Sequence, residues 1–327
     1  MERETLHSSA REAQRRLACQ IEGISHFIFS HPELGLEEYE SSRCLIEFIR
    51  EQGFDVIAPY CGYDTAFRAS FGDGGPTIAF LAEYDALPGF FEDKRNGHAC
   101  GHNWIAAACA GAAAAFAQAL CETGVKAKVV LIGTPAEETV CCKVKMVEEH
   151  AFDDIDVVIQ PHLAEKTSIN CAALAMNALL ITFRGRASHS ATSPWDGINA
   201  LDAVQLFFAG VNALRQHVRP NIRMHGIVTE GGEAANIVPA RAQCLFYVRS
   251  STREYLDVVL NKVYDIIKGA ALMTGTQYET EFPELPMDNL VNLPVLQTLA
   301  EEELLKEGMR NMVRPEEALE LAGSTDI

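Results

Sequence analysis

The sequence is poor in basic residues and has no cluster of them. Lysine and arginine together number 27, against 45 aspartate and glutamate residues, so that the 327-residue chain carries a formal net charge of −18. Nucleic-acid binding depends on clustered Lys and Arg side chains that neutralise phosphate groups. We therefore expect no nucleic-acid partner.

Disulfide spacing, a secretory signal and long hydrophobic runs are also absent. The ten cysteines are spread through apolar or helical contexts, which favours a reducing compartment and predicts a cytoplasmic protein. The longest apolar stretch, Trp104–Leu120, is alanine-rich and too weakly hydrophobic to predict a membrane span. We find no internal repeat and no phosphate-binding glycine motif, and we expect no membrane partner.

The first half of the chain has the pattern of an α/β sheet. Hydrophobic residues make up 48% of the sequence, enough for a large core, and the length is typical of about two domains. Apolar runs predict buried strands over Thr77–Ala82, Lys128–Ile132 and Asp156–Gln160. Helical periodicity predicts a scaffold helix from about Glu12 to Phe29 and a long helix from about Asn103 to Leu120. In such sheets, ligands gather at the carboxyl ends of the strands.

The pattern changes near residue 175. A strand around Leu179–Phe183 leads to a helix from about Ile198 to His217, and strands are predicted over Met224–Val228 and Ala242–Ser250. A helix from about Tyr255 to Leu272 follows. This order, over about one hundred residues, predicts a small α+β domain inserted into the first domain.

Metal-binding atoms gather where the predicted strands end. Only Gly101 separates Cys100 from His102, and thiolate and imidazole are the preferred ligands of zinc. Such a pair alone is as often buried in a core as bound to metal, and adjacent glutamates by themselves usually form a solvated face. However, Glu137–Glu138 and His162 follow two other predicted strands at the same edge of the sheet.

The two adjacent glutamates indicate a reaction. Successive side chains on an extended segment point in different directions, so Glu137 and Glu138 can take different roles. One can bind a metal ion while the other accepts the proton of a water molecule and passes it to a leaving amine. The pattern therefore predicts hydrolysis of an amide.

Several motifs along the chain carry a resemblance to a known family. They are Glu83–Pro88, Gly97–His102, Pro135–Glu138, His162 and Gly185–Ser190. Together they resemble the M20 metallopeptidases, and within them the amidohydrolase and aminoacylase-like branch, closest to the aminoacylase-1-like group. The likeness extends from His31 to Asp326. It implies a zinc-peptidase-like catalytic domain with a central mixed sheet, formed by residues 1–175 and 284–327, and an inserted α+β dimerisation or lid domain over residues 176–283.

The resemblance also implies a set of site residues. Two divalent metal ions, zinc or else manganese or cobalt, are expected on Cys100, His102, Glu138 and His162. Cys100 takes the bridging position, the two histidines serve one ion, and Glu138 serves the other. Glu137 matches the general base, and Asp85 matches an aspartate that orients a ligand imidazole.

Glu83 and His98 lie nearby in the sequence but are not among the expected site residues. Glu83 stands where other branches of the family carry a ligating histidine, and we expect His102 to do that work instead. His98 is expected to be structural.

Three residues of the inserted domain match family positions that reach a substrate. His189 matches a histidine that enters the partner subunit's site and stabilises a developing oxyanion. Asn236 matches an asparagine near the substrate, and Arg249 an arginine suited to a substrate carboxylate. Alternatively, His189 is a capping or surface residue and Arg249 a surface charge at a strand end. A homodimer is implied.

One family ligand is missing from the sequence. The resemblance predicts a last histidine ligand beyond Gly323–Asp326, and the chain ends at Ile327. We expect either a fragment of a longer product or a shortened, non-catalytic form that only dimerises with intact subunits. The predicted activity is metal-dependent hydrolysis of small dipeptides, such as the β-alanyl-lysine type, or of N-acyl amino acids. The net charge of −18 suits cationic substrates.

Overall fold

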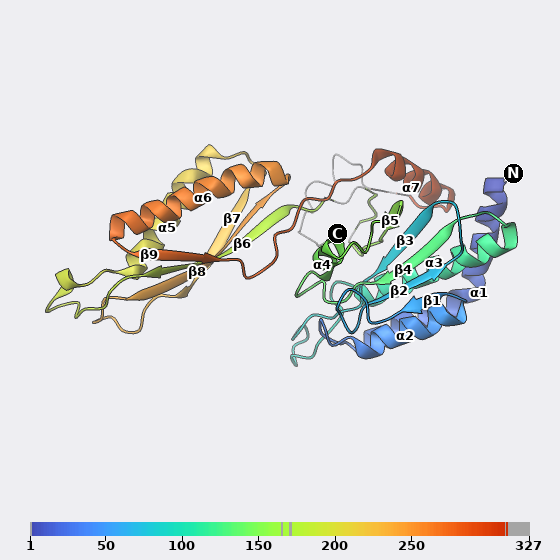
Figure 1. Ribbon diagram of the computed structural model, residues 1–327, viewed down its shortest axis with the longest axis horizontal. Helices are drawn as coiled ribbons and strands as arrows, with labels where there is room; N and C mark the ends of the chain where they lie inside the picture. Colours follow the sequence, from blue (N-terminus) through green and yellow to red (C-terminus); the bar gives the residue numbers. More distant parts are fainter. Residues whose placement is uncertain (1, 165, 170–171, 311, 313–327) are drawn as a thin grey trace. The chain divides into compact units, whose positions relative to one another are not determined.

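The computed structural model describes residues 2–164, 166–169, 172–310 and 312. It separates into two units, unit 1 up to residue 165 and unit 2 from residue 166 onward (Figure 1). The Gly323–Asp326 motif and Cys171 lie outside the described residues.

Unit 1 is built on a mixed sheet with the strand order β1-β2-β4-β3-β5. β3 (Thr77–Ala82), β4 (Lys128–Gly133) and β5 (Val157–Ile159) run parallel, which confirms the three predicted strands. β2 (Phe67–Phe71) lies antiparallel to β4, and β1 (Asp55–Ile57) antiparallel to β2. These two strands were not predicted, because neither is a continuous apolar run. They make the sheet mixed, as the resemblance implied.

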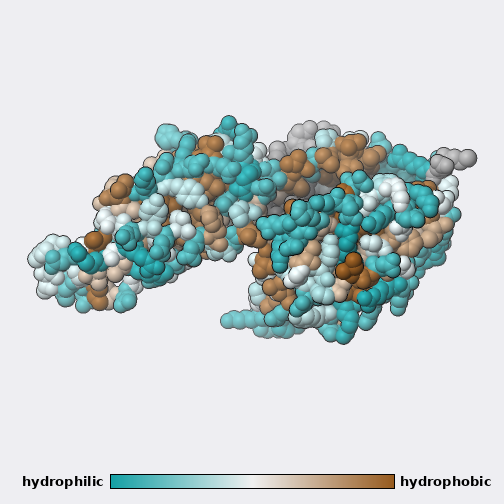
Figure 2. Space-filling view, in the orientation of Figure 1, coloured by the Kyte–Doolittle hydropathy of each residue, from teal (hydrophilic) through white to brown (hydrophobic). Residues whose placement is uncertain are grey.

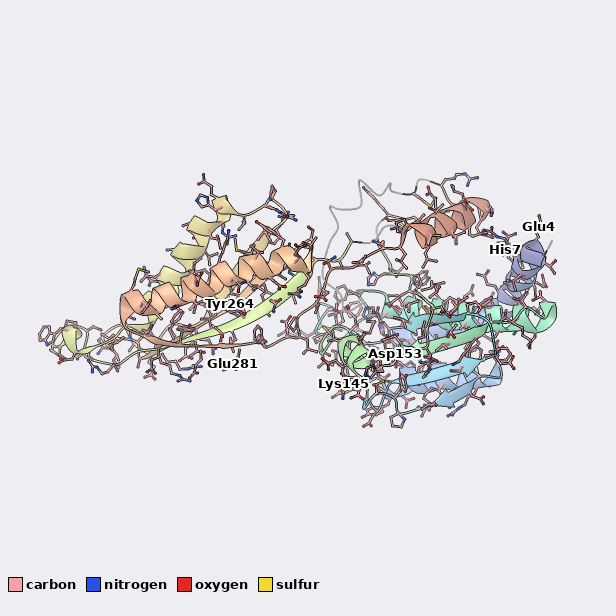
Figure 3. The ribbon with its side chains drawn as sticks, turned by 45° about the horizontal axis from the view of Figure 1, so that its top comes forward. Glu4, His7, Lys145, Asp153, Tyr264 and Glu281 are labelled. Carbon is pink, nitrogen blue, oxygen red and sulfur yellow. The ribbon has the colours of Figure 1, made fainter. Side chains whose placement is uncertain are left out.

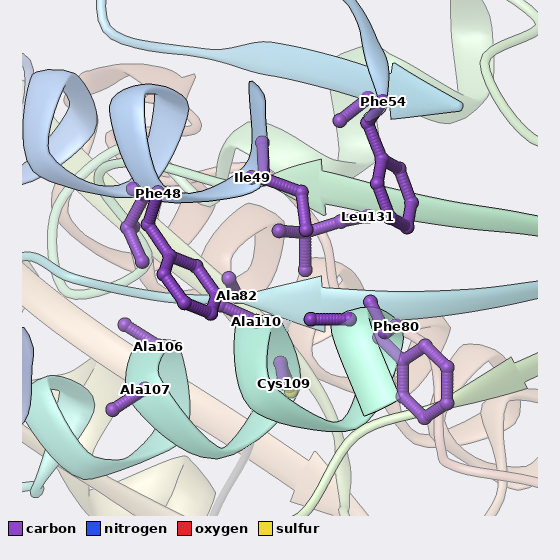
Figure 4. Close-up of a cluster of buried hydrophobic side chains, with 14 of the residues drawn as sticks. Phe48, Ile49, Phe54, Phe80, Ala82, Ala106, Ala107, Cys109, Ala110 and Leu131 are labelled. Atoms are coloured by element: carbon purple, nitrogen blue, oxygen red, sulfur yellow. The ribbon is translucent and has the colours of Figure 1, made fainter. Parts of the chain in front are cut away.

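Helices cover both faces of this sheet. α1 (Glu2–Ser30), α2 (Tyr39–Glu51) and α3 (His102–Thr123) share one hydrophobic core with the strands, and the short α4 (Cys142–Glu148) packs on the other face. Figure 4 shows the first core, in which Phe48 and Ile49 of α2 and the small side chains of α3 surround the strands. The unit is thus a three-layer α/β structure.

The alanine-rich α3 is the central helix of unit 1. Its small side chains allow close packing with α1: a Cβ atom on Gly111 would lie 2.5 Å from Cδ1 of Ile21. Within the described residues, α3 is the one helix long and apolar enough to cross a membrane, and 67% of its most apolar window is buried. That burial fits a core helix.

Unit 2 is built on an antiparallel sheet with the strand order β7-β8-β6-β9. Its strands are β6 (Ala175–Arg184), β7 (Arg223–Glu230), β8 (Arg241–Ser250) and β9 (Gln277–Glu281). α5 (Ala200–Leu214) and α6 (Arg253–Thr274) share a core with one face of the sheet. This confirms the predicted α+β order and adds β9, whose polar sequence gave no signal.

The ends of the two helices in unit 2 follow local chemistry. The side chains of Asn199 and Thr252 accept hydrogen bonds from the first free N–H groups of α5 and α6. Two short 3-10 helices, Pro194–Asp196 and Arg215–His217, flank α5. The helix predicted to His217 therefore changes geometry after Leu214.

The chain continues after unit 2's sheet into α7 (Pro294–Lys306). The assignment of residues 284–327 to a catalytic domain stays a prediction. In the view of Figure 2 the surface of both units is mainly hydrophilic, with scattered apolar side chains.

Candidate metal centre

Potential metal-binding side chains meet at the carboxyl edge of the parallel strands in unit 1. Asp85 follows β3, the glutamate pair Glu137–Glu138 follows β4, and His162 follows β5. Cys100 and His102 reach the same edge from the start of α3. Parallel neighbours end at one edge of a sheet, so the topology brings together residues that lie up to 77 positions apart in the sequence.

His102 is held in one orientation by Asp85. The ring is fully buried, and its Nδ1 atom lies 2.8 Å from Oδ1 of Asp85 and 3.0 Å from the Asp85 carbonyl oxygen. Because both partners only accept, Nδ1 carries a proton, so Nε2 is the nitrogen that can bind a metal ion once it has lost its own proton. Oδ2 of Asp85 accepts the backbone N–H of Glu138 at 2.9 Å, which ties the β3 and β4 ends together.

Cys100, His102 and His162 form one group of donor atoms, all within 4.8 Å of one another. Nδ1 of His162 lies 2.8 Å from the carbonyl oxygen of Leu163, so its Nε2 is the nitrogen left for a metal ion. Gly101 makes this approach possible. Its φ is +76°, and a Cβ atom there would lie 2.2 Å from Cδ1 of Leu163.

His102, Glu137 and Glu138 form a second group within the same 4.8 Å limit. Nε2 of His102 lies 3.8 Å from Oε1 of Glu138, too far for a hydrogen bond but close enough for both atoms to belong to one metal centre. Both atoms are buried and make no hydrogen bond among the described residues. Buried polar atoms are otherwise almost always satisfied, so these donors fit a divalent cation.

The charges around the site favour a cation. Burial opposes a positive charge on His102, but the hydrogen bond with Asp85 and the charge of Glu83 outweigh it and raise the pKa of the ring to about 11. Contact with His102 lowers the pKa of the Cys100 thiol, but burial and the Glu138 carboxylate raise it above its usual value. A metal ion bound here must displace protons from both ligands.

Glu38 holds the turn that carries the glutamate pair. This buried residue accepts the backbone N–H of Ala136 at 2.7 Å and the Thr65 hydroxyl at 2.9 Å. Ala136 has a φ of +58°, an unusual backbone for a residue with a side chain. A Cβ atom on Gly35 would lie only 3.0 Å from Cα of Ala136. The sequence analysis did not identify Glu38, because an isolated glutamate in a polar segment has no local signal.

Glu83 is buried beside His102, but its charge is already paired. One carboxylate oxygen lies 2.7 Å from Nζ of Lys143, and the other lies 3.6 Å from Nε2 of His102. Burial raises the pKa of Glu83, but the charges of Lys143 and His102 outweigh burial and lower it. Close by, burial and the charge of His102 lower the pKa of His98 to about 4, so that His98 is neutral.

The three candidate residues of unit 2 do not form one cluster within that unit. His189 and Asn236 lie together on the surface, where residues 189 and 237 pair and the N–H of Ser190 donates to the Asn236 carbonyl at 3.0 Å. Arg249, with Cζ 5.8 Å from the Tyr247 ring centroid, lies near the far end of β8. At about 3.3 Å per residue, the strand rise separates the two ends of β8 by roughly 30 Å.

The chain is similar to known peptidases and hydrolases. Residues 176–273 match the peptidase dimerisation domain family. The Xaa-Arg dipeptidases of Mus musculus and Homo sapiens are each 35% identical to the chain, over 86% and 85% of it, and the aligned part spans 66% of either relative. One of the subunits of the p-aminobenzoyl-glutamate hydrolase of Escherichia coli is 36% identical over 82% of this chain and 59% of its own length.

Solved structures show the same fold. A dinuclear metal-binding peptidase of the M20 family from Bacillus subtilis has a TM-score of 0.72 and 20% identity, over 95% of this chain and 85% of that one. An aminobenzoyl-glutamate utilization protein from Klebsiella pneumoniae has a TM-score of 0.72 and 20% identity, over 97% of this chain and 88% of that one.

Unit 1 is an α/β structure with a cluster of potential metal ligands, and unit 2 matches a peptidase dimerisation domain. Together these features are typical of metallopeptidase-like proteins. Within that class, the chain belongs to the M20 family of peptidases and amidohydrolases. The family expected from the sequence motifs is therefore confirmed.

Proposed function

We propose that the protein is a metal-dependent hydrolase that cleaves the amide bond of small dipeptides. The observation that carries this proposal is the pair of donor groups sharing His102, whose Nε2 atom is buried without a hydrogen-bond partner among the described residues. The relatives named Xaa-Arg dipeptidase and p-aminobenzoyl-glutamate hydrolase support the reaction class.

The proposal assigns a role to each residue of the centre. Cys100, His102, Glu138 and His162 would hold the two ions: Cys100 would take the bridging position, the two histidines would serve one ion and Glu138 the second. Bound divalent ions act as Lewis acids that polarise the amide carbonyl and activate water.

Glu137 is the proposed general base. It takes the proton of the attacking water and delivers it to the leaving amine. Asp85 keeps the His102 ring in the tautomer that leaves Nε2 unprotonated, as its 2.8 Å contact with Nδ1 supports.

We propose zinc as the metal, with manganese or cobalt as alternatives. Thiolate and imidazole together suit zinc, but carboxylate ligands also accept the other two ions. Nine cysteines are free among the described residues, which supports a reducing, cytoplasmic location.

The proposed substrates are dipeptides that carry a basic residue, such as β-alanyl-lysine. The Xaa-Arg dipeptidases among the relatives and the net charge of −18 support this choice. N-acyl amino acids are the alternative, supported by a relative named N-acetyl-L-cysteine deacetylase, 30% identical over 67% of this chain.

Unit 2 is the proposed dimerisation and lid domain of a homodimer. The match to the peptidase dimerisation domain supports this role. β8, roughly 30 Å long, separates Arg249 from His189 and Asn236. This separation supports roles in two different active sites: His189 and Asn236 reach the partner's site, and Arg249 serves a substrate carboxylate.

A substrate panel with metal analysis tests this function. Metal-stripped protein is reloaded with zinc or manganese and incubated with Xaa-Lys and Xaa-Arg dipeptides, N-acetyl amino acids and p-aminobenzoyl-glutamate. We expect basic dipeptides to be cleaved fastest. No hydrolysis of any amide by the zinc-loaded protein would contradict the proposal. One ion or none per chain, with dimers still formed, would instead support a form that only dimerises.

A further inference from the structure

A buried lysine lies directly behind the candidate metal centre, and the proposed mechanism does not use it. Lys143, in the first turn of α4, has a side chain that is only 2% exposed. Lysine is almost never buried to this extent without a charged partner. Its partner is Glu83, whose side chain is 1% exposed and whose Oε1 atom lies 2.7 Å from Nζ.

The second oxygen of Glu83 faces the metal centre. Oε2 lies 3.6 Å from Nε2 of His102, the atom shared by both groups of donors. A metal ion bound to Nε2 at about 2.1 Å therefore lies close to the Glu83 carboxylate. An unpaired carboxylate in this place is a strong ligand for a divalent cation.

The ion pair between Lys143 and Glu83 weakens the attraction of the Glu83 carboxylate for a metal ion. Nζ of Lys143 neutralises the Glu83 charge, and a neutralised carboxylate attracts a cation far less than a free one. Lys145, labelled in Figure 3, is two residues further along α4 and makes a different contact. Its Nζ lies 4.9 Å from the centroid of the Tyr63 ring, so it is not part of the ion pair with Glu83.

We propose that Lys143 is a positioning residue that holds the Glu83 carboxylate out of the metal ligand set and leaves Nε2 of His102 to bind the ion. The inference rests on the metal centre proposed above. It gives a physical reason why a carboxylate so close to His102 does not act as a ligand.

The first test removes both charges together. In the double variant Glu83→Gln/Lys143→Met, the net charge of the pair stays zero and the side-chain volumes change little, so the fold is retained. We expect the zinc content and the zinc affinity, measured by competition with a chromophoric chelator, to stay within about threefold of wild type. Loss of a bound zinc ion from the double variant would show that Glu83 is a ligand and would overturn the inference.

The second test frees the carboxylate. Lys143→Met leaves Glu83 unpaired beside Nε2 of His102, so we expect manganese and zinc to bind at least about tenfold more tightly than in wild type. The metal-free variant should melt about 10 °C lower than wild type, and added metal should recover most of that loss. Lys145→Met, the matched control on the same helix, should leave the metal affinity unchanged.

The two tests separate this inference from the proposed function. The melting temperature of Lys143→Met is compared with that of wild type, with and without metal. If the decrease is the same in both states and the metal affinity does not rise, Lys143 only supports the fold and the inference is wrong. Wild-type protein that binds no zinc overturns both the inference and the proposed function. Wild-type protein that binds zinc, with a double variant that loses an ion, overturns the inference alone.

Discussion

The candidate residues of the two units differ in how firmly they are held. In unit 1, His102 is fully buried and Asp85 is 1% exposed, and a side-chain hydrogen bond of 2.8 Å fixes their geometry. In unit 2, His189 and Asn236 are exposed. Nδ1 of His189 accepts backbone N–H groups of Ala191 and Thr192, at 3.2 Å and 3.3 Å.

This difference indicates a division of work. A reaction centre needs side chains that are held in place before the substrate arrives, and only the edge of unit 1 meets that condition among the described residues. In the proposed dimer, the exposed His189 and Asn236 would gain a defined environment from the surface that covers them. We therefore expect changes in unit 1 to abolish metal binding or catalysis, and changes in unit 2 to act between subunits.

The largest effect is expected from Glu137→Gln. Loss of the general base should lower kcat by about 10³-fold on the best dipeptide substrate, with zinc content unchanged. Steady-state kinetics and metal analysis measure both quantities. Glu148→Gln, an exposed position at the end of α4, is the control. An active Glu137→Gln variant would remove Glu137 from the mechanism.

The next effect concerns Glu38 and pH. Burial raises the pKa of Glu38 to about 7, above the ordinary value of 4.5. Its contribution to stability is therefore full below about pH 4.5 and is lost as pH rises through about 7, a change of about 3 kcal/mol. Urea unfolding of the metal-free protein from pH 4.5 to 8 measures this loss.

Glu38→Gln should remove that part of the pH dependence while it keeps the acceptor for the Ala136 N–H. Glu37→Gln, an exposed neighbour, should retain the wild-type profile. Identical pH profiles for wild type and Glu38→Gln would show that Glu38 does not titrate in this range.

A smaller effect is expected from Asp85→Asn. The amide no longer favours the His102 tautomer, and loss of such an orienting partner lowers metal affinity by about 10- to 100-fold. Chelator competition measures the zinc affinity, with Asp93→Asn in the exposed loop as the control. Unchanged affinity would mean that His102 is fixed by packing alone.

The smallest effect tests whether the two units act across a dimer. Glu137→Gln and His189→Ala subunits are each expected to be inactive, but when they are mixed in equal amounts, half of the dimers contain one intact site. Activity should then return to about one quarter of the wild-type value. No recovery in mixtures shown to exchange subunits would place His189 in its own chain's site.

The sequence was informative where chemistry and local pattern coincide. The strands β3 and β4 were predicted because a short apolar run bounded by turn residues usually forms a buried strand. The donor residues that follow these strands were then expected at the carboxyl edge of the sheet. The antiparallel β2 was not predicted, because the polar Arg68 interrupts its apolar pattern. Its pairing partner, β4, lies about sixty residues away.

The supporting residues could not be predicted. Glu38 and Lys143 are charged residues in short polar or helical segments, where solvent exposure is the usual outcome. Their burial depends on contacts with Ala136 and Glu83, which the tertiary fold brings near. No local pattern encodes such contacts. The candidate ligands could therefore be proposed from the sequence, whereas the residues behind them could not.

The zinc content of wild type and His102→Ala shows whether the donor atoms of unit 1 bind metal, because His102 belongs to both donor groups. Metal-stripped protein is reloaded with zinc, desalted and analysed for metal. We expect two zinc ions per wild-type chain, at most one retained by His102→Ala, and two retained by His150→Ala, an exposed histidine of the same unit. A wild type that retains no zinc, or a His102→Ala variant that retains both ions, would contradict the account.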